Sequence, residues 1–271
     1  MNVWESIILG IVEGLTEYLP VSSTGHLIAT QFLLGGEQND AINAFEVCIQ
    51  GGAILAVLGL YFPRVKQMFL GLMGKDPVGL RLLINIIIGF IPAAVVGLLC
   101  SHLIKTYLFD ARTVMISWAV GGIVILLYVR MRAKKGLGQG GKALEELSPR
   151  GALGVGLMQC LGMCPGVSRS LMTMLGGLTV GLSVAAAVEF SFLLGLITLG
   201  AATCYDAMKH GAEMVECLGW LPMVVGTIVA WLSALLAVKW MVGYLNRHSL
   251  AIFGWYRLLA AAAMFCLIFV L

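Results

Sequence analysis

The stretch Gly10-Ile-Val-Glu-Gly-Leu-Thr-Glu-Tyr-Leu-Pro-Val-Ser-Ser-Thr-Gly-His26 decides the fold of this chain. It lies in the middle of an apolar region, 3–35, that is long enough to cross a membrane. Its run from Pro20 to Gly25 interrupts that region, because proline removes a backbone donor and helices usually end before it. Each half is too short to span a bilayer, so we predict two short helices that form a re-entrant pair.

A second break of the same kind lies in the apolar region 151–183, at Cys164-Pro-Gly-Val-Ser-Arg-Ser170. When Ser22-Ser23 is aligned with Ser168-Arg169, Glu13 falls opposite Gln159. Further along, Phe45-Glu46 in the first half corresponds to Glu189-Phe190 in the second. Each half then has one broken pair and three spans. Because three is an odd number, the halves insert in opposite senses, which is the inverted-repeat architecture of many membrane proteins.

Composition indicates that a bilayer surrounds the chain. Of 271 residues, 60% are apolar and 11% are charged, against about 25% charged in soluble domains. We predict an all-α integral membrane protein with six transmembrane helices and two re-entrant helix pairs. The expected spans are 42–62, 82–102, 112–129, 185–205, 218–240 and 250–271. The whole of 1–271 is one membrane domain, divided into repeat 1 (about 1–130), a cytoplasmic linker (about 130–150) and repeat 2 (about 151–271).

The positive charges set the expected orientation. Twelve of the seventeen basic residues fall in 63–81, 130–150 and 239–249. Loops rich in lysine and arginine stay in the cytoplasm, so we expect these three loops there and both termini on the outer side. The segment 134–148 is rich in glycine and lysine and is expected to be a flexible linker. No cleavable signal peptide is expected at the start of the chain.

Two carboxylates stand directly before the first break. Glu13 and Glu17 are four residues apart, so one face of a helix carries both. Like charges at that spacing repel, and a low dielectric strengthens the repulsion. A shared proton or a divalent cation would relieve it, and magnesium and calcium prefer carboxylate oxygens. We favour a metal or phosphate site over a water pocket with one protonated glutamate.

Each break is followed by residues suited to holding an anion. Ser22, Ser23 and Thr24 can cap one half-helix, and the free N–H groups at such a helix start attract phosphate. Ser168 and Ser170 repeat the arrangement, although either could act as a cap alone. Arg169 adds a planar fork that matches phosphate oxygens.

His26 lies three residues after Ser23, on the same face of the half-helix. It could serve as base, acid or phosphoryl acceptor, and a purely structural histidine is the alternative. The remaining ionisable residues of the apolar segments are Glu46, Glu189 and Arg257. We expect these three to form internal ion pairs that hold the bundle.

The run Gly10–His26 closely resembles the N-terminal signature of the undecaprenyl-diphosphate phosphatases, also called bacitracin-resistance proteins. Pro165-Gly-Val-Ser-Arg-Ser170 is similar to their second signature. Shorter matches cover 45–50, 189–194 and 256–257, so the resemblance extends over essentially the whole chain. It departs from the family at Leu171, where glycine is usual, at Leu175, where serine is usual, and at Gly51, where leucine is common.

The resemblance implies hydrolysis of undecaprenyl diphosphate to undecaprenyl phosphate on the outer face of the bacterial inner membrane, which recycles the carrier for peptidoglycan synthesis and confers bacitracin resistance. It implies a divalent cation, magnesium or calcium, on Glu13 and Glu17. It makes Glu17, Ser23, His26 and Arg169 the catalytic group, with either Ser23 or His26 as nucleophile. The implied phosphate-binding residues are Ser22, Thr24, Ser168, Ser170 and Thr173.

Two other functions compete with this interpretation. Inverted repeats with broken helices are also typical of transporters, so a transporter or flippase for an anionic or phosphorylated lipid is the main alternative. An intramembrane serine hydrolase using Ser23 and His26 is the second, although it has no need for Arg169 or the glutamate pair. The expected partners are a polyprenyl diphosphate and membrane lipids, without nucleic acid. The sequence leaves the oligomeric state, including a homodimer, open.

Overall fold

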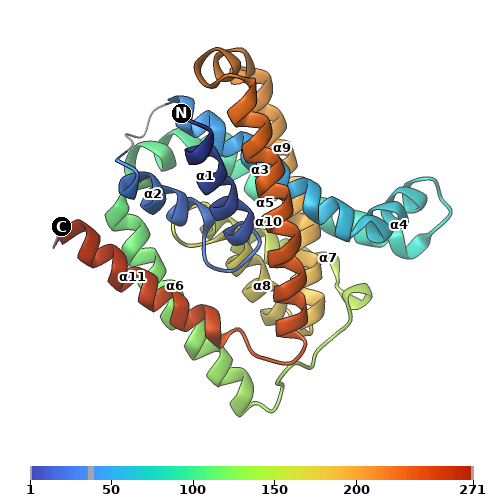
Figure 1. Ribbon diagram of the computed structural model, residues 1–271. Coiled ribbons are helices and arrows are strands. Elements are labelled where there is room, and N and C mark those ends of the chain that lie inside the picture. Colours follow the sequence, from blue (N-terminus) through green and yellow to red (C-terminus); the bar gives the residue numbers. More distant parts are fainter. Residues whose placement is uncertain (1, 36–39, 270–271) are drawn as a thin grey trace.

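The computed structural model describes residues 2–35 and 40–269, without the side chains of 40–44, 101–102, 105 and 210–218. Over these residues the chain is helical, as predicted, with one isolated bridge between Lys142 and Leu182. The elements are α1 (Val3–Thr16), α2 (Ser23–Leu33), α3 (Asp40–Leu60), α4 (Phe62–Leu72), α5 (Pro77–Leu108), α6 (Ala111–Lys134), η1 (Leu144–Glu146), α7 (Pro149–Leu161), α8 (Arg169–Thr179), α9 (Val184–Leu218), α10 (Trp220–Leu245) and α11 (Ala251–Phe269) (Figure 1).

The predicted spans correspond to five long helices and one bent pair. Among the described residues, α5, α6, α9, α10 and α11 are each long and apolar enough to cross a membrane. α3 and α4 pass the same test only together, and they are bent by 77° at Tyr61. The expected span 42–62 is therefore half of a bent pair. The end of the last predicted span, 270–271, lies outside the described residues.

The segment 63–81 is not the loop that its charges suggested. It holds most of α4 and the first turn of α5, which form a helical hairpin projecting from the bundle (Figure 1). Gly71 and Gly79 allow the two helices to touch backbone to backbone, since a Cβ on either would lie 2.1 or 2.0 Å from atoms of the partner helix. The loop prediction was wrong because basic residues on an exposed helix resemble those of a loop.

Both broken regions are helix–break–helix in the structure. α1 ends before Glu17 and α2 begins at Ser23, while α7 ends at Leu161 and α8 begins at Arg169. The cap residues Ser22 and Ser168 have φ of 73° and 80°, and among the described residues they are the two non-glycine positions with positive φ. Both side chains accept a hydrogen bond from the backbone N–H three residues on. The two breaks therefore share one backbone geometry.

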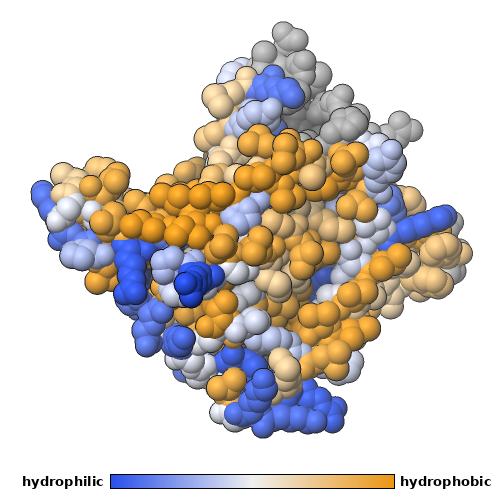
Figure 2. Space-filling model, turned by 180° about the vertical axis from the view of Figure 1, so that it is seen from behind, coloured by the Kyte–Doolittle hydropathy of each residue, from blue (hydrophilic) through white to orange (hydrophobic). Residues whose placement is uncertain are grey.

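The surface of the bundle is unusually apolar. Leu98, Leu99, Leu236 and Leu259 are each at least 70% exposed. Figure 2 shows hydrophobic side chains over much of one face, with hydrophilic ones gathered toward the lower edge. Soluble monomers rarely expose apolar patches beyond a few hundred Å², so these side chains face lipid, and the chain is a multi-pass membrane protein.

The core is built around α8, which is buried along its length from Ser170 to Leu178 and packs against α7 and α9. Leu171 and Leu175 are buried in this core, in the same cluster as Phe190 and Phe192. The backbone N–H of Leu171 still donates to Ser168 Oγ at 3.2 Å. The bulk at position 171 thus fills the core and leaves the cap in place.

The connection between the halves contacts the bundle through hydrogen bonds and two buried leucines. Lys142 N–H donates to Gly181 O at 2.8 Å, and Ser183 N–H donates to Lys142 O at 3.0 Å. Leu144 and Leu147 are both buried. Two leucines three residues apart give this polar segment an apolar anchor, which its glycine and lysine content obscured.

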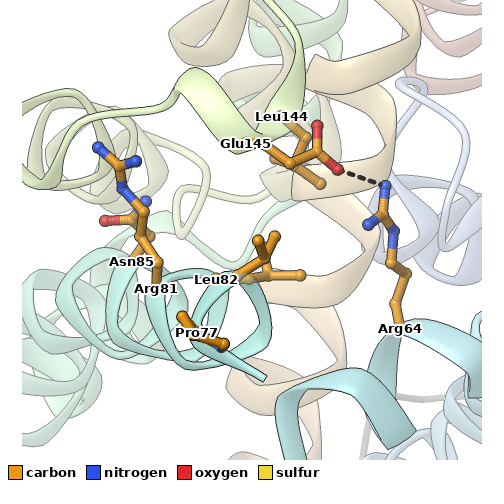
Figure 3. A pocket seen from close by; sticks show the side chains of 8 residues that line it. Arg64, Pro77, Arg81, Leu82, Asn85, Leu144 and Glu145 are labelled. Atoms are coloured by element: carbon orange, nitrogen blue, oxygen red, sulfur yellow. Dashed lines mark ion pairs between the residues drawn. The ribbon is translucent and has the colours of Figure 1, made fainter. Parts of the chain in front are cut away.

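A cavity of about 350 Å³ lies between this connection and the α4–α5 hairpin. Arg64 spans one side of it, donating through Nη2 to Glu145 at 2.9 Å and through Nε to Glu189 at 2.6 Å. Figure 3 shows Arg81 on the opposite side. The cavity is lined by Arg64, Pro77, Val78, Arg81, Leu82, Asn85, Leu144 and Glu145. None of the predicted site residues lines it, so the chemistry must be sought at the breaks.

Candidate active site

The two breaks meet through an ion pair between Arg169 and Glu17. Nη2 of Arg169 donates to Glu17 Oε1 at 3.1 Å, and the two side chains are 11% and 6% exposed. A pair so shielded from water interacts far more strongly than one on a surface. The structure thus brings together a carboxylate from the first break and a guanidinium from the second, as the sequence led us to expect.

Glu17 also contacts the start of α2. Ser23 Oγ donates to Glu17 Oε2 at 2.5 Å, and both side chains are buried. One carboxylate therefore accepts hydrogen bonds from a hydroxyl on one side and a guanidinium on the other. A hydroxyl bonded directly to a base is the usual arrangement of an activated nucleophile.

Arg169 is held on further sides by residues that the sequence did not indicate. Its Nη1 donates to the backbone carbonyl of Ser191 at 3.2 Å, and its guanidinium lies over the ring of Tyr18 at 5.5 Å. Gly195 provides the space for it, because a Cβ there would lie 2.1 Å from Nη1. Ser191 and Gly195 belong to α9, and nothing in their local sequence marks them as neighbours of the second break.

The hydroxyl groups of α8 mainly join the two breaks. Ser170 Oγ donates to the carbonyl of Leu19 at 2.8 Å and lies 3.0 Å from Ser168 Oγ. Thr173 Oγ1 lies 2.6 Å from Ser191 Oγ. These contacts place Ser168, Ser170 and Thr173 beside Arg169 with their hydroxyls already engaged, and their predicted contact with phosphate stays a prediction.

Two further predicted phosphate ligands lie at the start of α2. Ser22 Oγ accepts from Gly25 N–H at 3.5 Å, so Ser22 acts as the cap. Thr24 is half-buried in the first turn of the helix. Both residues are close in sequence to Ser23, and their backbone N–H groups belong to the same helix start.

His26 is oriented toward α11. Its Nδ1 lies 2.7 Å from Ser22 O and its Nε2 lies 2.7 Å from Tyr256 Oη. The rings of His26 and Tyr256 are stacked, with centroids 5.6 Å apart. Among the described residues, both ring nitrogens are thus occupied by partners other than Glu17 and Ser23. Tyr256 falls in the short family match at 256–257, but the sequence assigned it no role at the site.

Glu13 is a buried carboxylate whose oxygens have no hydrogen-bond partner among the described residues. It lies one turn before Glu17, within electrostatic reach of both Glu17 and Arg169. A buried charge without a partner is costly, so this carboxylate is suited to a cation. No cluster of three or more acidic, histidine or cysteine side chains that could hold a metal occurs in the described part of the chain.

The expected ion-pair set of Glu46, Glu189 and Arg257 was wrong in its partners. Glu46 accepts from the amide of Gln31 at 2.7 Å, and Glu189 pairs with Arg64. Within the described part of the chain, Arg257 donates only to backbone carbonyls. The three residues point to different elements, because helix packing separates groups that share only hydropathy and charge.

Comparison with known proteins agrees with this arrangement. The family model for bacitracin resistance protein BacA matches residues 6–263. An undecaprenyl-diphosphatase of Sorangium cellulosum is 42% identical over 96% of this chain and 84% of its own length. Undecaprenyl-diphosphatase 1 of Chromobacterium violaceum is 44% identical over 94% of this chain and 93% of its own, and an undecaprenyl-diphosphatase of Aquifex aeolicus is 39% identical over 96% of both. This chain belongs to the bacitracin resistance protein BacA family.

Proposed function

We propose that this chain hydrolyses undecaprenyl diphosphate to undecaprenyl phosphate and inorganic phosphate. The observation that carries the proposal is the buried contact of Ser23, Glu17 and Arg169, which joins a hydroxyl, a base and a phosphate-binding cation at one point. Three bacterial proteins named undecaprenyl-diphosphatase are similar to this chain over most of their length.

Ser23 is the nucleophile in this proposal and Glu17 is its base. Glu17 Oε2 takes the proton of Ser23 Oγ, which attacks the terminal phosphorus while the bond from that phosphorus to the bridging oxygen breaks. Undecaprenyl phosphate leaves with the electron pair of that bond. Water then displaces Ser23 Oγ from phosphorus, Glu17 returns the proton to the serine, and inorganic phosphate is released. His26 is less suited to attack, because both of its ring nitrogens are engaged by Ser22 and Tyr256.

Arg169 stabilises the charge on the transferring phosphoryl group. Phosphoryl transfer depends mainly on positioning and on charge stabilisation, and Arg169 and Ser23 are held by the two oxygens of one carboxylate. A phosphoryl group at Ser23 is therefore within reach of the guanidinium. The first N–H groups of α2 and α8 have no partner within their helices and add to the attraction.

A divalent cation, magnesium or calcium, would be held by Glu13 together with Glu17. The two unpartnered oxygens of Glu13 support this assignment. Magnesium in phosphate-processing sites is commonly bound by one or two carboxylates, with phosphate oxygens and water as the other ligands. When bound, such an ion would neutralise charge on the diphosphate.

The architecture supports a site at the interface of two inverted repeats. α1 packs against α10, and the corresponding helices of the other halves, α7 and α5, also pack against each other. α3 packs against α9, and α6 packs against α11. Each pairing joins an element of one half to one of the other half, and the matched caps at Ser22 and Ser168 relate the breaks. We take α1–α2 and α7–α8 as re-entrant pairs whose breaks meet within the membrane.

The basic segments support an orientation in which the site faces the outer side. The α6–α7 and α10–α11 connections lie at the same end of the molecule (Figure 1), where the Gln139 amide donates to His248 O at 2.7 Å. By the positive-inside rule this end faces the cytoplasm. We propose on this basis that the site opens to the outer face of the bacterial inner membrane, where hydrolysis would recycle the peptidoglycan carrier and counter bacitracin.

Phosphate release from purified protein tests the function. In detergent, with neither a gradient nor a sealed membrane, the protein is expected to release phosphate from undecaprenyl diphosphate. EDTA is expected to abolish release, and added magnesium or calcium to restore it, because a cation held by Glu13 and Glu17 would neutralise charge on the diphosphate. No release in detergent, together with diphosphate movement across reconstituted vesicles, would identify a transporter or flippase. If EDTA does not affect the release, the cation has no part in the reaction, and the protein is a serine hydrolase that works without a metal.

Gly195 offers a test of the position of Arg169. Gly195→Ala places a methyl group 2.1 Å from Arg169 Nη1, so it is expected to displace the guanidinium and lower kcat about a hundredfold. Gly200→Ala lies on the same helix and meets nothing within 4 Å, so it is expected to keep wild-type kcat. Steady-state phosphate release by both purified variants checks this. Wild-type kcat in Gly195→Ala would contradict the role assigned to Arg169.

A further inference from the structure

Arg257 is a fully buried arginine on α11 that the proposed chemistry does not use. Its Nη1 donates to the carbonyl of Pro20 at 3.2 Å, and its Nη2 donates to the carbonyl of Gly166 at 2.5 Å and to that of Ser117 at 2.9 Å. Among the described residues no carboxylate pairs with it. The guanidinium is therefore bound entirely by main-chain oxygens.

The two break carbonyls that it binds occupy equivalent positions. Pro20 lies two residues before the cap Ser22, and Gly166 lies two residues before the cap Ser168. Both caps have the same positive-φ backbone. One planar side chain thus joins corresponding points of the two breaks, and a guanidinium holds its acceptors in a fixed fork.

The starts of α2 and α8 follow directly from these anchored points. Ser23 and Arg169 are the first residues of those helices, and both contact Glu17. A shift of about 1 Å in a reacting group can cost about a hundredfold in rate. Whatever fixes the separation of the breaks therefore fixes the separation of the hydroxyl and the guanidinium.

We propose that Arg257 is a positioning residue that sets the relative placement of the two breaks, and with it the contact of Ser23, Glu17 and Arg169. The proposal rests on the proposed function for its kinetic consequence. A merely structural arginine would affect only the stability of the fold, whereas a positioning residue lowers kcat in protein that is still folded.

The surroundings of Arg257 provide a variant that leaves the arginine itself unchanged. A Cβ at Gly121 on α6 would lie 2.3 Å from Arg257 Nη2, so Gly121→Ala pushes the guanidinium from its carbonyls. Gly243 on α10 meets nothing within 4 Å, which makes Gly243→Ala the matched control.

A second buried arginine controls for the loss of buried charge. Arg132 is 6% exposed and, among the residues that the structure describes, also donates only to carbonyls, those of Gly138, Gly140 and Leu178. Its acceptors lie in the connection between the halves and at the end of α8, away from the breaks. Arg132→Gln removes the same kind of side chain without touching either break.

The experiment measures kcat and KM for phosphate release, the thermal midpoint, and the affinity for methylenediphosphonate, a diphosphate analogue whose P–C–P bridge cannot be hydrolysed. In Arg257→Gln we expect kcat per folded protein to fall about a hundredfold and the diphosphonate to bind about tenfold more weakly. Arg257→Lys should recover part of both, and Gly121→Ala should resemble Arg257→Gln. Arg132→Gln and Gly243→Ala should keep wild-type kcat, even where the thermal midpoint falls.

Two results would overturn the proposal. One is wild-type kcat per folded protein in Arg257→Gln, and the other is an equal loss of kcat in Arg132→Gln. If the wild-type protein releases no phosphate, the proposed function fails, and the diphosphonate affinities alone decide on Arg257. Equal affinities in wild type and Arg257→Gln would then reject the positioning role.

Discussion

Replacing Arg169 by alanine is expected to lower kcat for phosphate release by about a thousandfold or more. An arginine that stabilises phosphoryl charge contributes about that factor. Arg169 also pairs with Glu17 at 3.1 Å in a buried setting, so the alanine variant leaves that carboxylate without its cation. Single-turnover release of phosphate from the lipid diphosphate measures the effect on the chemical step.

Arg169→Lys separates charge from geometry. Lysine keeps the positive charge but loses the fork that reaches both Ser191 O and Glu17. We expect an intermediate loss of about a hundredfold. A wild-type rate in Arg169→Ala, with the protein folded by its thermal midpoint, would exclude Arg169 from the reaction.

Replacing Glu17 by glutamine is expected to lower kcat by about a thousandfold. Glutamine has nearly the same shape, and its carbonyl can still accept a hydrogen bond from Ser23 or Arg169. It cannot take a proton, and a general base commonly contributes 10²–10⁴-fold, of which we take about the middle. Steady-state kcat for phosphate release, measured on protein purified in detergent, checks the prediction.

Glu5→Gln is the matched control for that variant. Glu5 lies on α1, the helix that ends just before Glu17, and forms a capping box with Asn2, a role that glutamine also fills. Its kcat should equal the wild-type value. If Glu17→Gln turned over as fast as Glu5→Gln, Glu17 could not be the base.

The effects of replacing Glu17 and Arg169 should also be coupled. Because Arg169 and Ser23 share one carboxylate, the loss in the double variant Glu17→Gln/Arg169→Ala should be smaller than the product of the two single losses. Independent, multiplicative losses would show that the ion pair seen here has no part in the reaction.

Local sequence patterns predicted much of the fold. Pro20 and Pro165 mark the breaks, because each stands with glycine and serine in a cluster that interrupts an apolar run, and proline removes a backbone donor. The long apolar runs marked the spans, since their length alone matches a bilayer. The same local signals failed at 63–81, where an exposed helix with arginine and lysine resembles a loop.

By itself the sequence determined which groups are available to the site: a glutamate pair before one break, an arginine after the other, and serines at two helix starts. Only the tertiary structure decided which of them meet. Arg169 contacts a glutamate 152 residues away, and Arg257 contacts the carbonyl of Pro20 across 237 residues. Helix periodicity orders residues along one segment, whereas such partners are determined by the packing of whole helices, in which most buried donors find an acceptor.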